Sequence, residues 1–372
     1  MSLFTPPAQQ NTARAKPAAT AATPFSAASA RKLTGAATNY SNLAFSAAVA
    51  DKIPSDGWLE GTVFTIAATG GAGTVAVASA DAPWNALKTF TVSDASGNPI
   101  INLDGYAAYL MQLYQASFLG RADIDTSAFS AVAPAGDFQF QLFAMQTFGR
   151  DLRGALPNSN AAAAYQYSLL FNSESNIYST NPTTAPTFSS TIEAIIRAAP
   201  PATDAFGNPN ITEPPGNGAL QQFWSSQIAN VVSGANTISL VRVGNTIRNH
   251  ILVFRDSGGS RANADSTGVT PSAITFMINS AARYNNISTI TLRNLAYRQT
   301  QIQQPAGVIP LLYTDDPNGA ALHEYGDSYI ETNSASLLQL QFTSSAAGTV
   351  QIITNDIVSN GGSALRADGA TL

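Results

Sequence analysis

The feature that most constrains this chain is a succession of short segments in which apolar and polar residues alternate, each followed by turn-forming residues. Residues 138–143 (FQFQLF) alternate without interruption, and comparable runs occupy residues 58–66, 165–171 and 237–243. A period of two places the apolar side chains on one face of a strand, and Gly, Pro, Asn and Asp end each strand. Many short strands of this kind are typical of β sandwiches and barrels, so the pattern predicts an all-β fold.

The strand pattern occurs twice, on either side of a segment rich in Pro and Gly at residues 180–218. Further strands are predicted at residues 251–254, 289–292, 336–342 and 349–353. Asp104 is predicted to cap a helix over residues 106–115, because the apolar residues there have helical spacing. The predicted organisation is an N-terminal basic arm (1–40), a first jelly roll (41–185), a Pro/Gly-rich connection (186–235), a second jelly roll (236–355) and a flexible C-terminal arm (356–372).

The composition favours a structural role for the chain. Charged residues make up 11% of the sequence, against roughly 25% in an average soluble domain. A surface of Ser, Thr, Asn, Gln and Ala suits permanent contact with copies of the same chain. Absence of cysteine excludes disulfides and thiolate zinc sites. The net charge of −5 gives no reason to expect nucleic-acid binding, and no apolar run has the roughly 18 residues of a membrane span.

The first fifty residues are basic, in contrast to the rest of the chain. Their charged residues are Arg14, Lys16, Arg31 and Lys32, and the first acidic residue is Asp51. One interpretation is a solvated, disordered tail. The other is an arm that lies against an anionic surface, such as lipid head groups or a neighbouring subunit.

Residues that could carry catalysis are few. The two histidines are His250, expected between two strands, and His323, and no nucleophile elbow or phosphate-binding loop accompanies them. Two pairs of acidic residues, Asp123 with Asp125 and Asp315 with Asp316, could bind calcium or act as acid and base, but solvated loop acids are the favoured interpretation. We therefore predict a protein that is not an enzyme and has no catalytic residues, no cofactor and no metal.

Several windows of the sequence resemble the tectivirus-type double jelly-roll major capsid proteins. In the second half these are residues 244–248, 251–260 (ILVFRDSGGS), 305–308 and 338–342. In the first half they are residues 140–148, 150–156 (RDLRGAL) and 165–172. The first hundred residues match only in strand pattern. The residues in these windows that most closely resemble the turns and strands of the family are Asp151, Leu152, Gly154, Phe254, Asp256, Gly258 and Gly259.

This resemblance implies two jelly rolls side by side, with short helices in loops, and three subunits forming a trimer of pseudo-hexagonal outline that tiles an icosahedral shell. It further implies an internal lipid membrane beneath the shell, contacted by the basic arm. The implied partners are other copies of the chain, penton or vertex proteins, minor capsid proteins and membrane lipid, with no specific nucleic acid. The implied location is the capsid shell of the virion, assembled in the host cytoplasm.

Two alternatives remain open from the sequence. A carbohydrate- or receptor-binding β protein, of a phage tail or secreted lectin, would expose a cleft of aromatics such as Tyr284, Tyr313 and Tyr325. A β-sandwich glycosidase would depend on two carboxylates, with Asp123 and Asp315 as candidates.

Overall fold

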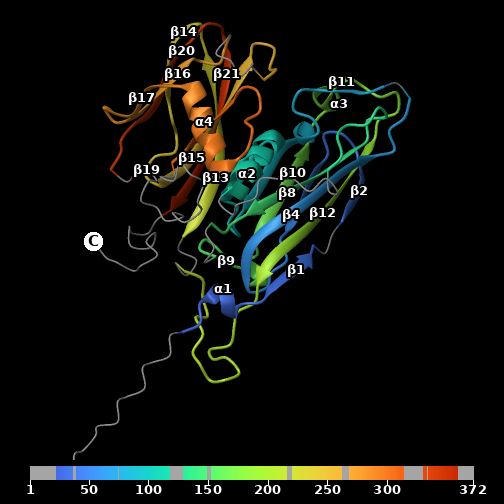
Figure 1. Ribbon diagram of the computed structural model, residues 1–372. Coiled ribbons are helices and arrows are strands. Elements are labelled where there is room, and N and C mark those ends of the chain that lie inside the picture. Colours follow the sequence, from blue (N-terminus) through green and yellow to red (C-terminus); the bar gives the residue numbers. More distant parts are fainter. Residues whose placement is uncertain are drawn as a thin grey trace, which may run out of the picture.

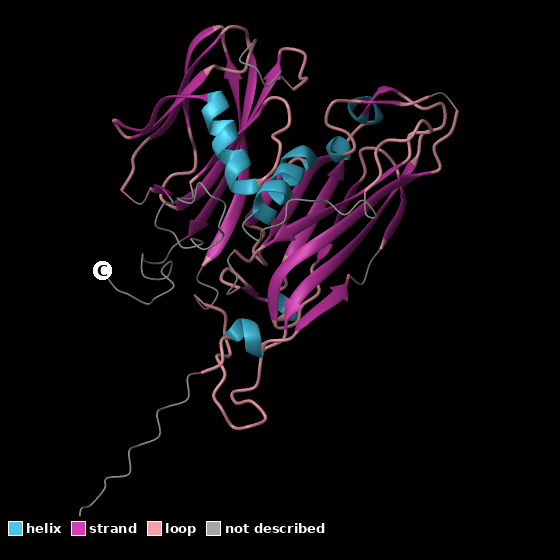
Figure 2. Cartoon of the chain, in the orientation of Figure 1, coloured by secondary structure: helices cyan, strands magenta, loops and turns pink. Residues whose placement is uncertain are grey.

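The computed structural model describes residues 22–36, 39–73, 75–117, 129–148, 152–215, 220–261, 268–313, 330–332 and 334–358. These residues form two β-rich lobes that stand side by side, with helices between and beside them (Figures 1 and 2). The sequence therefore predicted the strand-rich class correctly.

The first lobe is a sandwich of two sheets. One sheet has the strand order β1-β12-β4-β8, and the other has the order β3-β10-β6-β7. The strands are β1 (Arg31–Gly35), β3 (Ala48–Lys52), β4 (Trp58–Thr69), β6 (Leu87–Ser93), β7 (Pro99–Leu103), β8 (Phe138–Met145), β10 (Gln166–Phe171) and β12 (Thr187–Arg197). Shorter additions are α1 (Phe25–Ala28), β2 (Tyr40–Leu43), β5 (Val77–Ala78), β9 (Leu156–Pro157), α3 (Glu174–Ile177) and β11 (Tyr178–Thr180).

The second lobe is built in the same way. Its sheets have the orders β13-β21-β15-β18 and β14-β20-β16-β17. The strands are β13 (Gln221–Val231), β14 (Gly234–Ser239), β15 (Thr246–Asp256), β16 (Ala273–Ile278), β17 (Ala281–Ser288), β18 (Val308–Leu312), β20 (Leu338–Ser344) and β21 (Gly348–Val358), with the short β19 (Ile330–Glu331) beside β15.

The two lobes share one topology. In each, the first, eighth, third and sixth principal strands form one sheet, and the second, seventh, fourth and fifth form the other. Each lobe also inserts a helix between its fifth and sixth principal strands: α2 (Gly105–Ser117) in the first and α4 (Thr289–Thr300) in the second. The repeat lies in the topology, because no sequence repeat accompanies it.

The lobes are joined through apolar packing. A short parallel pairing of β7 with β13 connects their sheets. The first-lobe core cluster includes Trp224, Ile251, Val253 and Ile353 from the second lobe. Leu252 and Phe254, on the opposite face of β15, belong to the second-lobe core. Strand β15 is therefore buried on both faces, which explains the uninterrupted apolar run at residues 251–254.

Three sequence-based boundaries need correction. The predicted N-terminal arm contains β1, whose residues pair with β12. The predicted connection, residues 186–235, contains β12 and β13, so the two sandwiches are linked by residues 198–220 alone. Residues 356–358, assigned to the C-terminal arm, end β21, where Asp356 and Ile357 are fully buried. The predicted N-terminal arm also contains α1, and residues 1–21 and 359–372 of the two predicted arms lie outside the described residues. Proline density obscured the alternating burial of β12, which is the true strand signal.

The helix predictions had mixed success. The helix after Asp104 is confirmed as α2, and the Asp104 carboxylate accepts a hydrogen bond from the Ala107 amide at 2.8 Å, as an N-cap does. Residues 289–292 were predicted to form a strand, which is wrong, because they begin α4. The alternating Thr-Ile-Thr-Leu sequence favours a strand locally, but Leu292 and Ala296 place one helical face on the core.

Candidate functional site

The lobe junction is the most elaborate polar arrangement in the described structure. In one part of the junction, the second-lobe sheet faces the N-terminal end of α2. The Gln351 amide of β21 donates to the Asp104 carboxylate. The Arg255 guanidinium of β15 lies 5.6 Å from the centre of the Tyr106 ring. Since Arg255 and Val253 share a face of β15, these contacts show that this face of the second lobe packs against α2.

A fully buried polar network occupies another part of the junction. Arg248 of β15 donates to Gln222 Oε1 at 2.9 Å and to Asn355 Oδ1 at 3.0 Å. Gln222 in turn donates to the backbone oxygens of Met145 and Gln146 in the first lobe, each at 3.0 Å. The network thus joins three strands of the second lobe to the loop that follows β8. A guanidinium at 1% exposure is tolerated because its donors are satisfied by neutral acceptors.

The turn after β15 makes a second polar contact between the lobes. The Asp256 carboxylate accepts from the amides of Gly258 and Ser260, at 2.9 and 3.0 Å. Gly259 has a positive φ of 82°, which the turn requires. The turn holds Arg261 so that its Nε donates to Asp81 of the first lobe at 2.6 Å, and Arg255 bonds the same carboxylate. The predicted residues Asp256, Gly258 and Gly259 therefore shape a turn at the junction, and Phe254 packs in the second-lobe core.

Residues 152–156 of the first-half window form a tight loop beside the junction. Leu152 and Gly154 have positive φ angles of 65° and 86°. A Cβ at Gly154 would lie 2.7 Å from the Gln146 oxygen and 2.7 Å from the Phe148 ring, so glycine is required there. The Phe148 amide donates to the Arg153 oxygen at 2.9 Å, which closes the loop. Asp151 lies outside the described residues.

The predicted basic residues are divided between described and undescribed parts of the chain. Arg14 and Lys16 lie outside the described residues. Arg31 and Lys32 lie in β1, with side chains 54% and 57% exposed. Arg31 and Arg197 both bond the carboxylate of Glu60, which is 2% exposed, and Lys32 pairs with Asp56 at 2.6 Å. Both described cations of the set therefore have acidic partners within the lobe.

The sequence predicted that His250 lies between two strands. This is wrong, because His250 lies inside β15. Its Nδ1 and the Tyr313 hydroxyl are 2.8 Å apart, and Phe276 packs against the imidazole. Complete burial lowers the pKa of His250 to about 3, so the ring is neutral. His323, Asp123, Asp125, Asp315, Asp316 and Tyr325 lie outside the described residues. Within the described ranges, no three His, Asp or Glu side chains are grouped to hold a metal ion.

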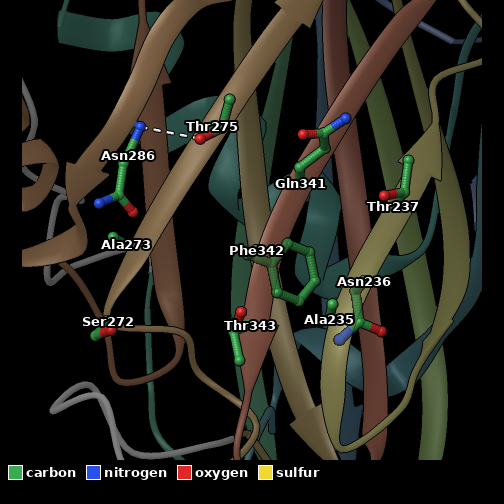
Figure 3. A pocket seen from close by; sticks show the side chains of 10 residues that line it. All are labelled: Ala235, Asn236, Thr237, Ser272, Ala273, Thr275, Asn286, Gln341, Phe342 and Thr343. Atoms are coloured by element: carbon green, nitrogen blue, oxygen red, sulfur yellow. Dashed lines mark hydrogen bonds between the residues drawn. The ribbon is translucent and has the colours of Figure 1, made fainter.

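The outer face of the sheet β14-β20-β16-β17 carries a shallow groove of about 360 Å³. Its lining is uncharged and largely polar, and Figure 3 shows Thr237, Gln341 and Thr275 along neighbouring strands. The Asn286 amide donates to Thr275 Oγ1 at 2.9 Å and fixes the rim of the groove. Such a face offers hydrogen-bonding groups and no electrostatic repulsion to a neighbouring protein.

Comparison with solved structures is decisive for the fold. The major capsid protein of Sulfolobus Turreted Icosahedral Virus superimposes with a TM-score of 0.66 at 12% identity, covering 91% of this chain and 99% of that protein. The chain has the double jelly-roll fold of viral major capsid proteins. No protein-family model and no curated protein matches the sequence.

Two further viral proteins have the same double jelly roll. The major capsid protein of bacteriophage PM2 aligns with a TM-score of 0.57 at 10% identity, over 90% of this chain and 100% of its own length. The Faustovirus major capsid protein aligns with a TM-score of 0.54 at 10% identity, over 88% of this chain and 90% of its own. The sequence-based resemblance to double jelly-roll capsid proteins is thus confirmed at the level of the fold.

Sequence analysis missed the residues that fix the double jelly roll at its centre. Neither Gln222 nor Asn355 stands out in the sequence pattern. Arg248 stands in the mostly polar stretch 246–250, just before the apolar run at residues 251–254, so no local signal marks it as buried. Among the described helices, none is long and apolar enough to cross a membrane.

Proposed function

We propose that this chain is the major coat subunit of an icosahedral virus. The observation that carries the proposal is that three major capsid proteins align with both lobes in order, over nearly the whole of each chain. The low charge content and the uncharged outer sheet of the second lobe agree with a protein whose surface contacts its own copies.

In this proposal three subunits form a trimer of pseudo-hexagonal outline, because three chains with two similar lobes each offer six similar units around one axis. Trimers tile the facets of the shell, and penton or vertex proteins and minor capsid proteins complete it. The protein then resides in the virion shell after assembly in the host cytoplasm. No cofactor, metal or specific nucleic acid takes part.

The proposal extends to an internal membrane beneath the shell, contacted by the N-terminal arm. Arg14 and Lys16 provide positive charge in the arm, and each cation near an anionic surface contributes about 1 kcal/mol. Flotation with vesicles of anionic or neutral lipid tests this part, with Arg14→Ala/Lys16→Ala as the variant. Equal flotation of the variant and the unchanged protein with anionic vesicles would remove the arm from the proposal.

The trimer is tested by light scattering coupled to size-exclusion chromatography, with electron microscopy of the same fractions. The expected mass is three times 38.7 kDa. A monomer that persists across the accessible concentration range, with no shells or pseudo-hexagonal particles, would contradict the coat function.

The aromatic-cleft alternative loses one of its three residues. Tyr313 is 3% exposed, and its hydroxyl contacts His250 in the second-lobe core. A buried tyrosine cannot stack against a sugar, so this arrangement does not favour a glycan-binding function.

A further inference from the structure

The link between the lobes carries the most exposed large apolar side chain of the described structure. Phe206 is 90% exposed, and the next in order, Val241, is 72% exposed. The exposed residues around Phe206, at positions 201–203, 205, 207 and 209, are Pro, Ala, Thr and Gly. A single exposed apolar side chain is ordinary on a protein surface, so the significance of Phe206 depends on how the chain holds it.

A closed loop over residues 203–209, which we name the link loop, presents Phe206 at its tip. Asp204 Oδ1 accepts from the backbone amides of Phe206 and Asn208, each at 2.8 Å, and Asp204 Oδ2 accepts from the Asn208 side chain at 2.9 Å. The Asp204 amide donates to the Asn208 oxygen at 2.9 Å, and Gly207 has a positive φ of 81°. The tip is therefore ordered before any partner binds, so a contact through Phe206 loses little conformational entropy.

The base of the link loop is braced by the segment that precedes α1. The Thr23 amide donates to the Pro209 oxygen, and the Ile211 amide donates to the Thr23 oxygen, each at 2.9 Å. The link loop projects past α1 at one end of the molecule (Figure 1). Phe206 is therefore held at the same end of the molecule from which the chain continues toward the N-terminal arm.

The chemistry around the tip favours a lipid surface over a protein partner. A stable protein interface buries roughly 800 Å² on each side, which a tip with one aromatic side chain does not supply. A bilayer interface accepts such a side chain, and attachment strengthens where cations lie near the same surface. Arg14 and Lys16 precede Thr23 by nine and seven positions, so the chain keeps both within about 30 Å of the base of the loop. Asp204, the one charged residue at 198–212, has both carboxylate oxygens bonded within the loop.

We propose that the link loop is a membrane anchor, in which Phe206 enters the head-group region of the bilayer beneath the shell. The inference rests on the internal membrane of the proposed function, which assigns lipid contact to the N-terminal arm. It adds a contact of different chemistry, because burial of an aromatic ring does not depend on lipid charge, whereas attraction of the arm requires anionic lipid. The composition of the vesicles therefore separates the two contributions.

Tryptophan fluorescence tests insertion directly. Phe206→Trp is mixed with phosphatidylcholine vesicles that contain brominated lipid, which quenches a tryptophan lying in the bilayer. The expected result is a blue-shifted emission with strong quenching, after subtraction of the three tryptophans of the unchanged protein. Val75→Trp is the matched control and shows neither effect. Val75 is 63% exposed and lies two residues before β5, which pairs with β11 at the opposite end of the first lobe (Figure 1).

Vesicle affinity provides the second test. Phe206→Ala is expected to weaken binding to neutral and anionic vesicles alike, by about tenfold. Its melting temperature stays unchanged, because the Phe206 side chain is hydrated in the folded chain. Arg14→Ala/Lys16→Ala weakens binding to anionic vesicles only, and Val75→Ala alters neither affinity.

Three results would contradict the anchor. Vesicle binding by the unchanged protein without quenching of Phe206→Trp removes the anchor and leaves the arm as the membrane contact. Failure of the unchanged protein to bind either kind of vesicle overturns the anchor together with the proposed membrane. Shielding of Phe206→Trp from iodide on trimer formation in the absence of lipid assigns the tip to a contact between copies instead.

Discussion

The two lobes present the same outer sheet in opposite states. In the second lobe this sheet is covered, and Trp224 and Ile251 are 1% and 0% exposed against the first lobe. In the first lobe the equivalent sheet leaves Leu33 and Phe143 open. The helices repeat the contrast, since α2 is covered nearly all round and α4 on one side only. The same topology therefore produces a sheet face that is buried within the chain in the second lobe and one that is partly exposed to solvent in the first lobe.

The difference shows where folding stability should reside. Burial of large apolar side chains and of a hydrogen-bonded network stabilises the second-lobe face in the single chain. The first-lobe face gains less of it, because Leu33 and Phe143 remain exposed. Substitutions at equivalent positions should therefore have unequal effects on the free energy of unfolding.

The largest contrast is expected between Trp224→Ala and Leu33→Ala, both on the outer face of a lobe's first strand. Loss of the buried indole should lower the free energy of unfolding by about 4 kcal/mol, through lost burial and the cavity that remains. Leu33→Ala should change it by less than about 0.5 kcal/mol, because that side chain is already hydrated. Urea denaturation of the unassembled chain measures both, and equal losses would abolish the contrast.

The next effect concerns charged groups at the two faces. Arg248→Ala should cost about 3 kcal/mol, since Gln222 and Asn355 lose a buried donor. Arg31→Ala should cost less than about 1 kcal/mol, because Glu60 keeps Arg197. Denaturant midpoints of the two variants give the comparison. A loss at Arg248 no larger than that at Arg31 would mean that the network does not stabilise the junction.

An intermediate effect should appear on acidification, and in the second lobe. His250 has a folded pKa of about 3, below its unfolded value near 6.5, so the unfolded state alone takes up a proton between these values. Stability should therefore fall as the pH drops through this window, by about 2 kcal/mol at pH 5. His250→Phe should remove that pH dependence, and His323→Gln should retain it. The free energy of unfolding is measured by denaturation at pH 7 and pH 5. An equal loss of stability in His250→Phe and the unchanged protein would contradict the assignment of this pH dependence to His250.

The smallest effect is expected for the exposed ion pair of the first lobe. Lys32→Ala should alter the free energy of unfolding by less than about 0.5 kcal/mol, because Lys32 and Asp56 are 57% and 47% exposed. Thermal unfolding in low and high salt measures the change. A loss above about 1 kcal/mol would show that this lobe depends on its basic strand more than its exposure indicates.

Local patterns accounted for much of the fold. The alternation at residues 138–143 predicted β8, the Asp104 cap predicted α2, and Gly259 marked a real turn. These features are encoded by neighbouring residues, so they can be found without the tertiary structure. Helix α4 could not be found in this way, because its β-branched first turn favours a strand until Leu292 and Ala296 meet the core.

The lobe junction was the least predictable part. The bonds of Arg248 to Gln222 and Asn355 span 26 and 107 positions of the sequence. Nothing local distinguishes such a buried arginine from an exposed one. The place of Leu33 on a sheet could not be predicted for a related reason, because Leu33 lies in a segment predicted to be an arm and joins Ile195 only through strand pairing.

The short link at residues 198–220 has a consequence for the order of assembly. The link joins the two lobes covalently. The contact between α2 and the second-lobe sheet therefore forms at a high effective concentration, whatever the protein concentration. Contacts between copies in the proposed coat have no tether and must obey mass action. A dilute solution would then hold single chains with both sandwiches complete, and rising protein concentration alone would drive their association.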